Sequence, residues 1–543
     1  MAVPEAALPS ADLSLEARVA SLEASYRKAI EERDQYRKLY LSMLELCRKL
    51  ERGILGQKRE RFSTAEGQLS LSVLETVLGN DGQPSEAQAI VPAPATVVPE
   101  HTRQKPTGRK PLPEKLPRVE IEVLPPEVER AGLDAFERIG EDVTETIERR
   151  PASLVVVRVK KPKFVPKDRD RLGETKVLQG SSPDLPIERG LAGPNLLADT
   201  IVRRWQDHLP LHRLERIYGR EGLELARSTV CAWHQELAGL ARPLLDAMWH
   251  DALASPYLCT DATGVLVQAK EKCEGGHFWV LIAPERHVLF QYSKRHDSAA
   301  VDEMLAGYQG FLVADAHAVY DHLYATGKVT EVGCWAHARR YFFKALDSDP
   351  ERARQALGMI GELFRVERER ASVPPEQRKA ARELEARPVV ERFFAWCERE
   401  APEVLDETPI RRGIGYALNQ REALCRFLAD GRLPIHNNAS ERELRREAVG
   451  RKNWLFVGSE EGAEANATFV SLLASCQLHG LEPQGYLRDL LCLLPGWTKS
   501  RVLELAPANW QKTLEQNDTQ ERLAQNVYRR VALGALAPHD AKK

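Results

Sequence analysis

The sequence lacks the features that would direct it to a membrane or out of the cell. It contains no run of about 18 apolar residues, which a membrane-spanning helix needs. Residues 1–30 do not have the basic and then apolar layout of a signal peptide. The nine cysteines include no CxxC pair and no even framework, which is typical of reduced thiols. We therefore expect a cytoplasmic protein with no membrane partner.

A large net charge is also absent, because 77 Lys and Arg residues nearly balance 79 Asp and Glu residues. A net charge of −2 neither supports nor excludes a nucleic-acid partner, since binding depends on local patches. Two basic patches are present, at residues 48–62 and 101–118. A chain of 543 residues is too long for one hydrophobic core, so we expect several domains.

The first 190 residues divide into three parts. Residues 13–62 carry apolar residues at heptad spacing, which predicts a coiled coil and self-association; a helix packed on its own chain is the alternative. Residues 63–118 are rich in Pro, Ala and polar residues, as in a disordered basic linker. Residues 119–124 and 153–165 alternate like strands, so we expect a small β module over 119–190.

Residues 191–250 have a helical pattern. A helix near 211–218, a Gly-containing turn and a second helix begun by Ser228 have the spacing of a helix-turn-helix, whose second helix enters a major groove. Helical hairpins of this length are common, so a hairpin without a role in DNA binding is the alternative.

The stretch 251–345 changes to alternating strands. Three strands, a helix, a strand, a helix and a last strand, "VTEVGCWAH", follow one another. This is the order of a ribonuclease H-like fold. Asp261 lies in the first strand and Asp315 ends the fourth.

The rest of the chain is expected to complete this core around a helical insertion. Residues 346–430 are rich in Glu and Arg and predict that insertion. Residues 431–500 then return to the sheet, with Glu441 opening a helix and "NWLFVG" resembling a strand. Residues 501–543 are expected to form a C-terminal tail. The predicted class is therefore multidomain α/β.

Two aspartates at neighbouring strand ends and one glutamate from a crossing helix would form an acidic cluster. Carboxylates that close together repel one another, and a pair of divalent cations removes the conflict. Mg²⁺ prefers such oxygen ligands, and two ions can promote in-line phosphoryl transfer. Taken singly, each residue has a simpler interpretation: a turn cap for either aspartate, and an exposed helix with ion pairs for "ERELRRE".

Basic and amide residues near Glu441 and in "CWAHARR" are expected to hold DNA phosphates. They are Asn437, Asn438, Arg442, Arg445, Arg446, Arg451, Lys452, His337, Arg339 and Arg340. The two asparagines also suit a helix N-cap, and His337 also suits a structural role. Cys334 and His337 have no partner pair with ligand spacing nearby, so we expect no zinc site.

Several motifs together resemble the transposases of the insertion-sequence-66 family. They include "LCTDATGV", "FLVADAHAVYDHL", "GCWAHARRYFF" and a long block that begins "NNASERELRREAVGRKNWLFVG". The resemblance runs in order over roughly residues 48–500. It implies that Asp261, Asp315 and Glu441 are the DDE triad of an enzyme that cleaves and joins DNA strands with two Mg²⁺ or Mn²⁺ ions.

The resemblance also implies partners. They are double-stranded DNA from the element ends and the target, a second copy of the chain, and small accessory proteins of the same element, in the nucleoid of a bacterium. Family members usually carry a cysteine zinc module before "IGEDV", but no cysteine occurs here between Cys47 and Cys231. The β module is therefore expected to be a degenerate version without zinc. A nuclease that does not join DNA and an inactive DNA-binding relic are the alternative functions.

Overall fold

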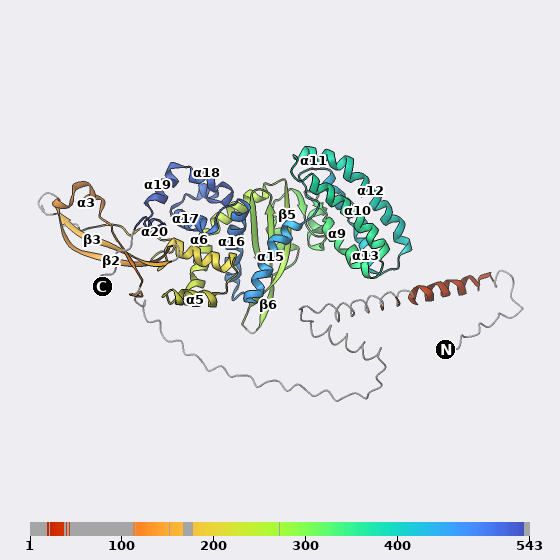
Figure 1. Ribbon diagram of the computed structural model, residues 1–543, viewed down its shortest axis with the longest axis horizontal. Helices are drawn as coiled ribbons and strands as arrows, with labels where there is room; N and C mark the ends of the chain where they lie inside the picture. The colour runs from red at the N-terminus through yellow and green to blue at the C-terminus, as the bar shows by residue number, and fades with distance from the viewer. Residues whose placement is uncertain are drawn as a thin grey trace, which may run out of the picture. The chain divides into compact units, whose positions relative to one another are not determined.

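The computed structural model describes most of the chain from residue 112 onward and part of a helix near the N-terminus (Figure 1). The described residues are 19–20, 22–36, 40, 43, 112–114, 116–150, 153–166, 177–270 and 272–536. They form many helices and two sheets, in agreement with the expected multidomain α/β class. Among these residues, no helix is both long and apolar enough to cross a membrane.

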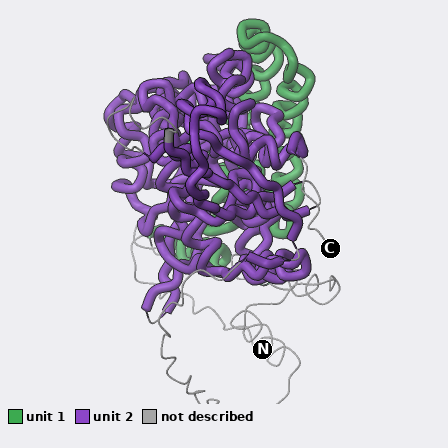
Figure 2. The backbone as a smooth tube through the Cα atoms, turned by 90° about the vertical axis from the view of Figure 1, so that its left-hand side faces the viewer, with its two compact units in different colours: residues 1–108, 337–421 green, residues 109–336, 422–543 purple. Residues whose placement is uncertain are grey.

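The chain divides into two compact units (Figure 2). Unit 1 comprises residues 1–108 and 337–421, and unit 2 comprises residues 109–336 and 422–543. In unit 1, every described residue between 19 and 43 is helical. Pairing of this helix into a coiled coil stays a prediction. The other residues of the predicted coiled coil, and the predicted linker up to residue 111, lie outside the described residues.

A long hairpin dominates the first sheet of unit 2. The strands are β1 (Arg118–Glu122), β2 (Phe136–Arg150), β3 (Ser153–Pro166) and β4 (Leu178–Gln179). β3 pairs in parallel with β1 and antiparallel with β2 and β4. The strands predicted near 119–124 and 153–165 are present. β2 was not predicted, because most of its first half is exposed on both faces and shows no apolar alternation.

The C-terminal segment completes the core of this sheet. The expectation of a tail over residues 501–543 is wrong up to residue 536, because these residues fold into short helices. Helix α20 (Val527–Ala532) places Tyr528 and Val531 against the valines of β1 and β3. The buried members of this core are Val119, Val155, Val157, Val159, Tyr528 and Val531.

The second sheet has five strands in the order β7-β6-β5-β8-β9. They are β5 (Tyr257–Gln268), β6 (Cys273–Ala283), β7 (His287–Ser293), β8 (Gly310–Val313) and β9 (Val329–Val332). β5, β6 and β7 pair antiparallel, whereas β5 with β8 and β8 with β9 pair in parallel. Helix α7 (Ser298–Met304) lies between β7 and β8 in the sequence.

One expected strand is shorter than predicted and another is absent. In "VTEVGCWAH" the strand ends at Val332, and helix α9 (Trp335–Lys344) begins within the motif. In "NWLFVG" there is no strand, because helix α15 (Asn438–Trp454) continues into it. Leu455 then takes a φ of 60°, which ends the helix. Only Val457 forms a bridge to β5.

Helices cover the second sheet. α15 packs on β5 and β6, and α16 (Glu460–Leu478) packs on β7. The long helix α6 (Arg227–Leu253) follows α5 (Leu211–Arg220) and packs against α16 (Figure 1). The helix, turn and helix expected over 211–250 are therefore present.

Two serines of α16 satisfy the free edge of β7. Phe290 donates its backbone N–H to Ser471 Oγ at 2.7 Å, and Val288 donates to Ser475 Oγ at 3.1 Å. Serines four apart lie on one helix face, and strand residues two apart point their amides the same way. The helix thus covers an edge that would otherwise be open to pairing with another strand.

The part of unit 1 from residue 346 onward is all-helical, as expected for an insertion. Its main helices are α10 (Pro350–Glu369), α11 (Pro375–Ala381), α12 (Arg387–Glu400) and α13 (Pro409–Asn419). Arg382 is only 1% exposed and binds Glu367 through two hydrogen bonds, of 2.8 and 2.7 Å. A buried guanidinium held in this fork fixes the link between α10 and α11.

A buried glutamate joins the first sheet of unit 2 to its helices. Glu148 of β2 is 0% exposed and accepts hydrogen bonds from the backbone N–H groups of Asn195 and Leu196. These two residues begin helix α4 (Pro194–Ile201). A side chain at Gly193 would collide with the Glu148 carboxylate, so this position requires glycine. Burial raises the pKa of Glu148 to about 8.

We predict that Glu148 makes stability fall as the pH rises. Its pKa is about 8 when folded against an ordinary 4.5, so between these values the folded state holds a proton that the unfolded state has released. Glu148→Gln should remove most of this dependence. The measurement is the thermal unfolding midpoint at about pH 5.5 and about pH 8.5. The exposed Glu137 of the same strand gives the control, Glu137→Gln. Equal pH dependence in both variants would contradict the prediction.

Candidate active site

The register of two parallel strands places Asp261 and Asp315 at the same level along the two strands. Cys259 of β5 pairs with Val313 of β8, which is the last residue of β8. Asp261 and Asp315 each lie two residues beyond this pair. Adjacent strands are about 4.8 Å apart, so Asp315, just after the end of β8, lies next to Asp261 within β5. Both are half-buried.

Tyr320 is a second sign that the two aspartates converge. This tyrosine is 2% exposed, and burial raises the pKa of its phenol, with further contributions from the charges of both Asp315 and Asp261. The charges of both carboxylates therefore raise the pKa of the same buried phenol. Nothing in the sequence pattern pointed to Tyr320.

Glu441 lies in the first turn of α15, which is fastened to β5 beside Asp261. The Asn437 side chain donates a hydrogen bond of 2.7 Å to the backbone carbonyl of Thr260. Its side-chain oxygen accepts a bond of 2.8 Å from the Ser440 hydroxyl. At the other end of the helix, Arg451 donates to Thr263 Oγ1 at 3.0 Å. Two hydrogen bonds thus lay α15 along the strand that carries Asp261.

The three carboxylates do not form a closed metal cage. Among the described residues, no group of three or more His, Cys, Asp or Glu side chains lies close enough to hold a metal ion. The donors that Asp261, Asp315 and Glu441 offer are carboxylate oxygens, which fit Mg²⁺ or Mn²⁺. The structure therefore brings the two aspartates together and places the glutamate on a helix packed against the same strand.

The predicted DNA-binding residues of α15 separate into two groups. Asn438, Arg442, Arg445 and Lys452 are exposed. The others are engaged within the protein. Arg446 binds Glu443 at 2.8 Å, as well as Gln206 and Gln477, and Arg451 binds Thr263.

Asn437 corrects a prediction. It is 0% exposed, so it does not offer a surface to DNA, and it occupies the N-cap position without a side-chain bond to the helix backbone. Its side chain instead holds Thr260 and Ser440. The sequence predicts a helix cap or a DNA contact for this pair of asparagines, but it does not reveal that one of the two is buried.

The remaining predicted contacts belong to unit 1. Arg339 and Arg340 are exposed on α9, and His337 is half-buried in its first turn. The Arg339 guanidinium lies 5.9 Å from the ring centre of Phe343, one turn later. These cations present a basic helix face within their own unit.

A histidine cluster beside Asp315 was missed by sequence reasoning. The His296 ring lies 4.7 Å from His277 and 4.8 Å from His317, and it stacks on Trp279 at 4.9 Å. Burial lowers the pKa of His296, with His317 acting in the same direction and Asp315 opposing it. The three histidines are 19 or more residues apart in sequence, so no spacing rule signals them.

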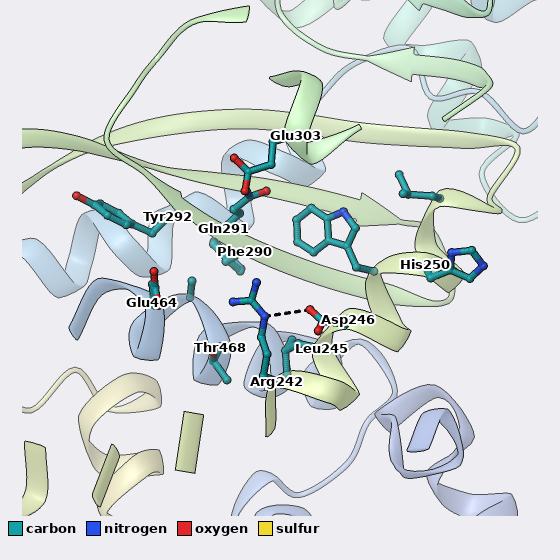
Figure 3. Close-up of a pocket in the computed structure, with 13 residues that line it drawn as sticks. Arg242, Leu245, Asp246, His250, Phe290, Gln291, Tyr292, Glu303, Glu464 and Thr468 are labelled. Atoms are coloured by element: carbon teal, nitrogen blue, oxygen red, sulfur yellow. Dashed lines mark hydrogen bonds and ion pairs between the residues drawn. The ribbon is translucent and has the colours of Figure 1, made fainter. Parts of the chain in front are cut away.

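The cavity drawn in Figure 3 lies away from these carboxylates. It has a volume of about 390 Å³ and is lined by residues of α6, β7, α7 and α16. Arg242 and Asp246 form an ion pair of 3.0 Å within it, and Glu303 and Glu464 add two more acidic side chains. An acidic cavity without any predicted site residue is not a candidate DNA site.

Models of known protein families match most of the chain. A family model described as transposase IS66 family matches residues 189–465, just over half of the chain. A model described as transposase C of IS166 homeodomain matches residues 42–121, and one described as IS66 C-terminal element matches residues 471–508. The three matches follow one another along the sequence.

Similar proteins occur in Sinorhizobium fredii. The uncharacterized protein y4hP is 30% identical over 490 residues, which cover 86% of this chain and 88% of that protein. The uncharacterized protein y4qI is 31% identical over 520 residues, with 91% and 94% coverage. The similarity therefore extends over nearly the whole length of these relatives.

We predict that Asn437 is needed to hold α15 on β5. Asn437→Ala leaves the Thr260 carbonyl without this donor and the Ser440 hydroxyl without its acceptor, which costs about 2 kcal/mol. The neighbouring Asn438 is exposed, so Asn438→Ala should change stability by less than about 0.5 kcal/mol. Denaturant unfolding of both variants checks this. Equal midpoints for the two variants would show that the buried amide is dispensable.

Proposed function

The chain belongs to the IS66 family of transposases, and we propose that it cleaves DNA at the ends of its element and joins the freed strand to target DNA. The proposed catalytic residues are Asp261, Asp315 and Glu441. The observation that carries the proposal is the parallel register of β5 and β8, which sets the two aspartates side by side. If either aspartate were only a solvated turn cap, nothing would require the two aspartates to lie side by side.

The topology of the second sheet supports a ribonuclease H-like core. An antiparallel meander of β5, β6 and β7 is extended beyond β5 by the parallel strands β8 and β9. The proposed triad residues come from β5, from the end of β8 and from a helix packed on β5. This is the arrangement that the sequence order predicted.

The metal ions belong to the proposal. We propose that Asp261 and Asp315 hold divalent Mg²⁺ or Mn²⁺, and that Glu441 joins them when DNA is bound. Two such ions, when bound, activate a water or a 3′-hydroxyl and stabilise the leaving oxygen. The side chains themselves bind the cations, and the Asn437 and Arg451 contacts orient the helix that carries Glu441.

The exposed cations of α15 are proposed to position the DNA. Arg442, Arg445 and Lys452 lie on the helix that begins with Glu441, so phosphates bound to them lie along the same helix. Arg339 and Arg340 of unit 1 are proposed as further phosphate contacts. The pair of helices α5 and α6 is proposed to read sequence in a major groove.

Assembly and partners follow from the same proposal. Two DNA ends must be held together for joining, so the active species is proposed to contain at least two copies of the chain. The heptad pattern of the N-terminal helix is proposed to join them. Small accessory proteins of the element and a location at the nucleoid are proposed from the family resemblance.

Transfer of a strand distinguishes this function from its alternatives. A nuclease of the same fold would cut a labelled end but not join it to a second duplex. An inactive relic would bind the ends and do neither.

We predict that cleavage and joining of the element's own terminal DNA require a divalent metal and Glu441. With Mg²⁺, wild type should release and transfer a labelled 3′ end, and EDTA should abolish both. Glu441→Gln should reduce both by more than about 100-fold, a larger loss than the roughly 10- to 100-fold typical of outer-shell partners. Glu464→Gln, at an exposed glutamate of α16, is the control. Unchanged chemistry in Glu441→Gln would overturn the assignment.

We also predict that the exposed cations of α15 contact phosphates. Replacing Arg442, Arg445 and Lys452 together by Ala should weaken binding to all DNA sequences alike. The slope of log affinity against log salt should become shallower by about 3, because each phosphate contact contributes about 0.9. The matched control replaces Lys499, Lys512 and Arg530, three exposed cations near the C-terminus. An identical slope in both triple variants would place the DNA elsewhere.

A further inference from the structure

A cavity with aromatic walls lies at the far end of α15 from Glu441. It has a volume of about 530 Å³, within the range of small-ligand sites. The turn of helix at residues 202–206, the starts of α5 and α6, and the segment that follows α15 line it. Trp205, Trp454 and Phe456 supply its rings. Its described lining contains arginine and histidine but no aspartate or glutamate.

A buried arginine and two tryptophans contribute to the lining of the cavity. Arg204 is 8% exposed, and it donates a hydrogen bond of 3.5 Å to the backbone carbonyl of Leu209. No ion pair joins it to a carboxylate among the described residues. Its guanidinium lies instead over two rings, 4.4 Å from Trp205 and 5.5 Å from Trp454. The indole N–H groups of both tryptophans are buried without a hydrogen-bond partner in the described structure. The cavity therefore offers a flat ligand aromatic rings to stack on, next to a buried cation.

The buried carboxylate of Glu447, whose charge acts on Arg204, does not line the cavity. Glu447 is 2% exposed and accepts a hydrogen bond of 3.0 Å from Asn466. Burial raises the pKa of Glu447 to about 7 and lowers that of Arg204 to about 10. At neutral pH the arginine is therefore charged while the glutamate is only partly ionised. The cavity consequently favours an electron-rich or anionic group.

Two independent routes give the distance from the cavity to the carboxylates. Trp454 is thirteen residues after Glu441 on one helix, which corresponds to about 20 Å. Val457 is bonded to β5 on both sides of Val267, through Leu266 O and Gln268 N at 2.8 Å each. Val267 is six residues after Asp261, again about 20 Å. This length equals about six nucleotides of one DNA strand.

We propose that this cavity receives one nucleobase swung out of the DNA that lies along α15, about six nucleotides from the cleavage point. The proposal rests on the proposed function. The flat face of a base stacks on the aromatic rings. The linked phosphate is attracted by Arg204. The absence of acidic lining residues suits this occupant.

The test measures how a mispaired base changes binding. Duplexes that carry the element terminus are made with a single mismatch at each of the positions from about four to about eight nucleotides from the cut. Binding is measured in EDTA, so that no chemistry is needed. A mismatch removes the cost of unpairing, so one position should bind wild type about tenfold more tightly than the paired duplex. An abasic nucleotide at the same position should not show this gain, because it has no base to stack.

Variants of the cavity identify where the base goes. Phe456 is 42% exposed, so Phe456→Ala should fold, and it should lose most of the mismatch gain while it binds paired DNA as wild type does. Trp454→Phe keeps a ring but reduces the stacking area, and it should lose part of the gain. The control is Leu455→Ala, at a residue that is 68% exposed and does not line the cavity.

Two outcomes would overturn the proposal: no position with a mismatch gain, or a gain that Phe456→Ala and Leu455→Ala affect equally. Failure of the proposed function is distinguishable. In that case paired terminal DNA would not be cleaved or joined by wild type with Mg²⁺, whatever the mismatch binding showed.

Discussion

The hydrogen bond from the Asn437 side chain to the Thr260 carbonyl links the two parts of the chain that carry the proposed catalytic residues. On one side is β5, whose parallel pairing with β8 sets Asp261 beside Asp315. On the other is α15, which carries Glu441 and most of the exposed cations proposed to hold DNA. The whole helical insertion separates residues 260 and 437 in the sequence. The hydrogen bond of one buried amide therefore holds together two segments that are far apart in the chain. Its burial makes the bond stronger than at a surface and its loss correspondingly costly.

Buried polar side chains perform the same task elsewhere in unit 2. Ser471 and Ser475 bind the backbone edge of β7, and Glu148 holds the first turn of α4 against β2. In each case a side chain from one element satisfies backbone groups of another that would otherwise be unpaired. Such contacts fix register and orientation, which apolar packing alone leaves loosely determined. A site that depends on the relative placement of a strand and a helix needs this kind of contact.

The aromatic cavity is organised differently. There, the buried guanidinium of Arg204 lies over the rings of Trp205 and Trp454, and no acidic residue is among the described residues that line the cavity. Aromatic rings and a cation around a cavity of this size are features of binding sites rather than of cores. The single helix α15 spans from Glu441 to this cavity, so the carboxylates and the aromatic rings have a fixed spacing along any DNA bound to that helix.

The sequence by itself determined the local elements and the identity of the candidate triad. Alternation predicted the strand that contains Asp261 and the strand that ends two residues before Asp315, and the motifs around Glu441 indicated the family. Periodicity failed where burial is not periodic: β2 has a largely exposed first half, and the last residues complete the core of another sheet. Only the tertiary structure decided that Asn437 is buried, that Tyr320 senses both aspartates, and that Arg204 meets Trp454. These facts depend on contacts between residues far apart in the chain, and a local pattern carries no information about which distant segment covers it.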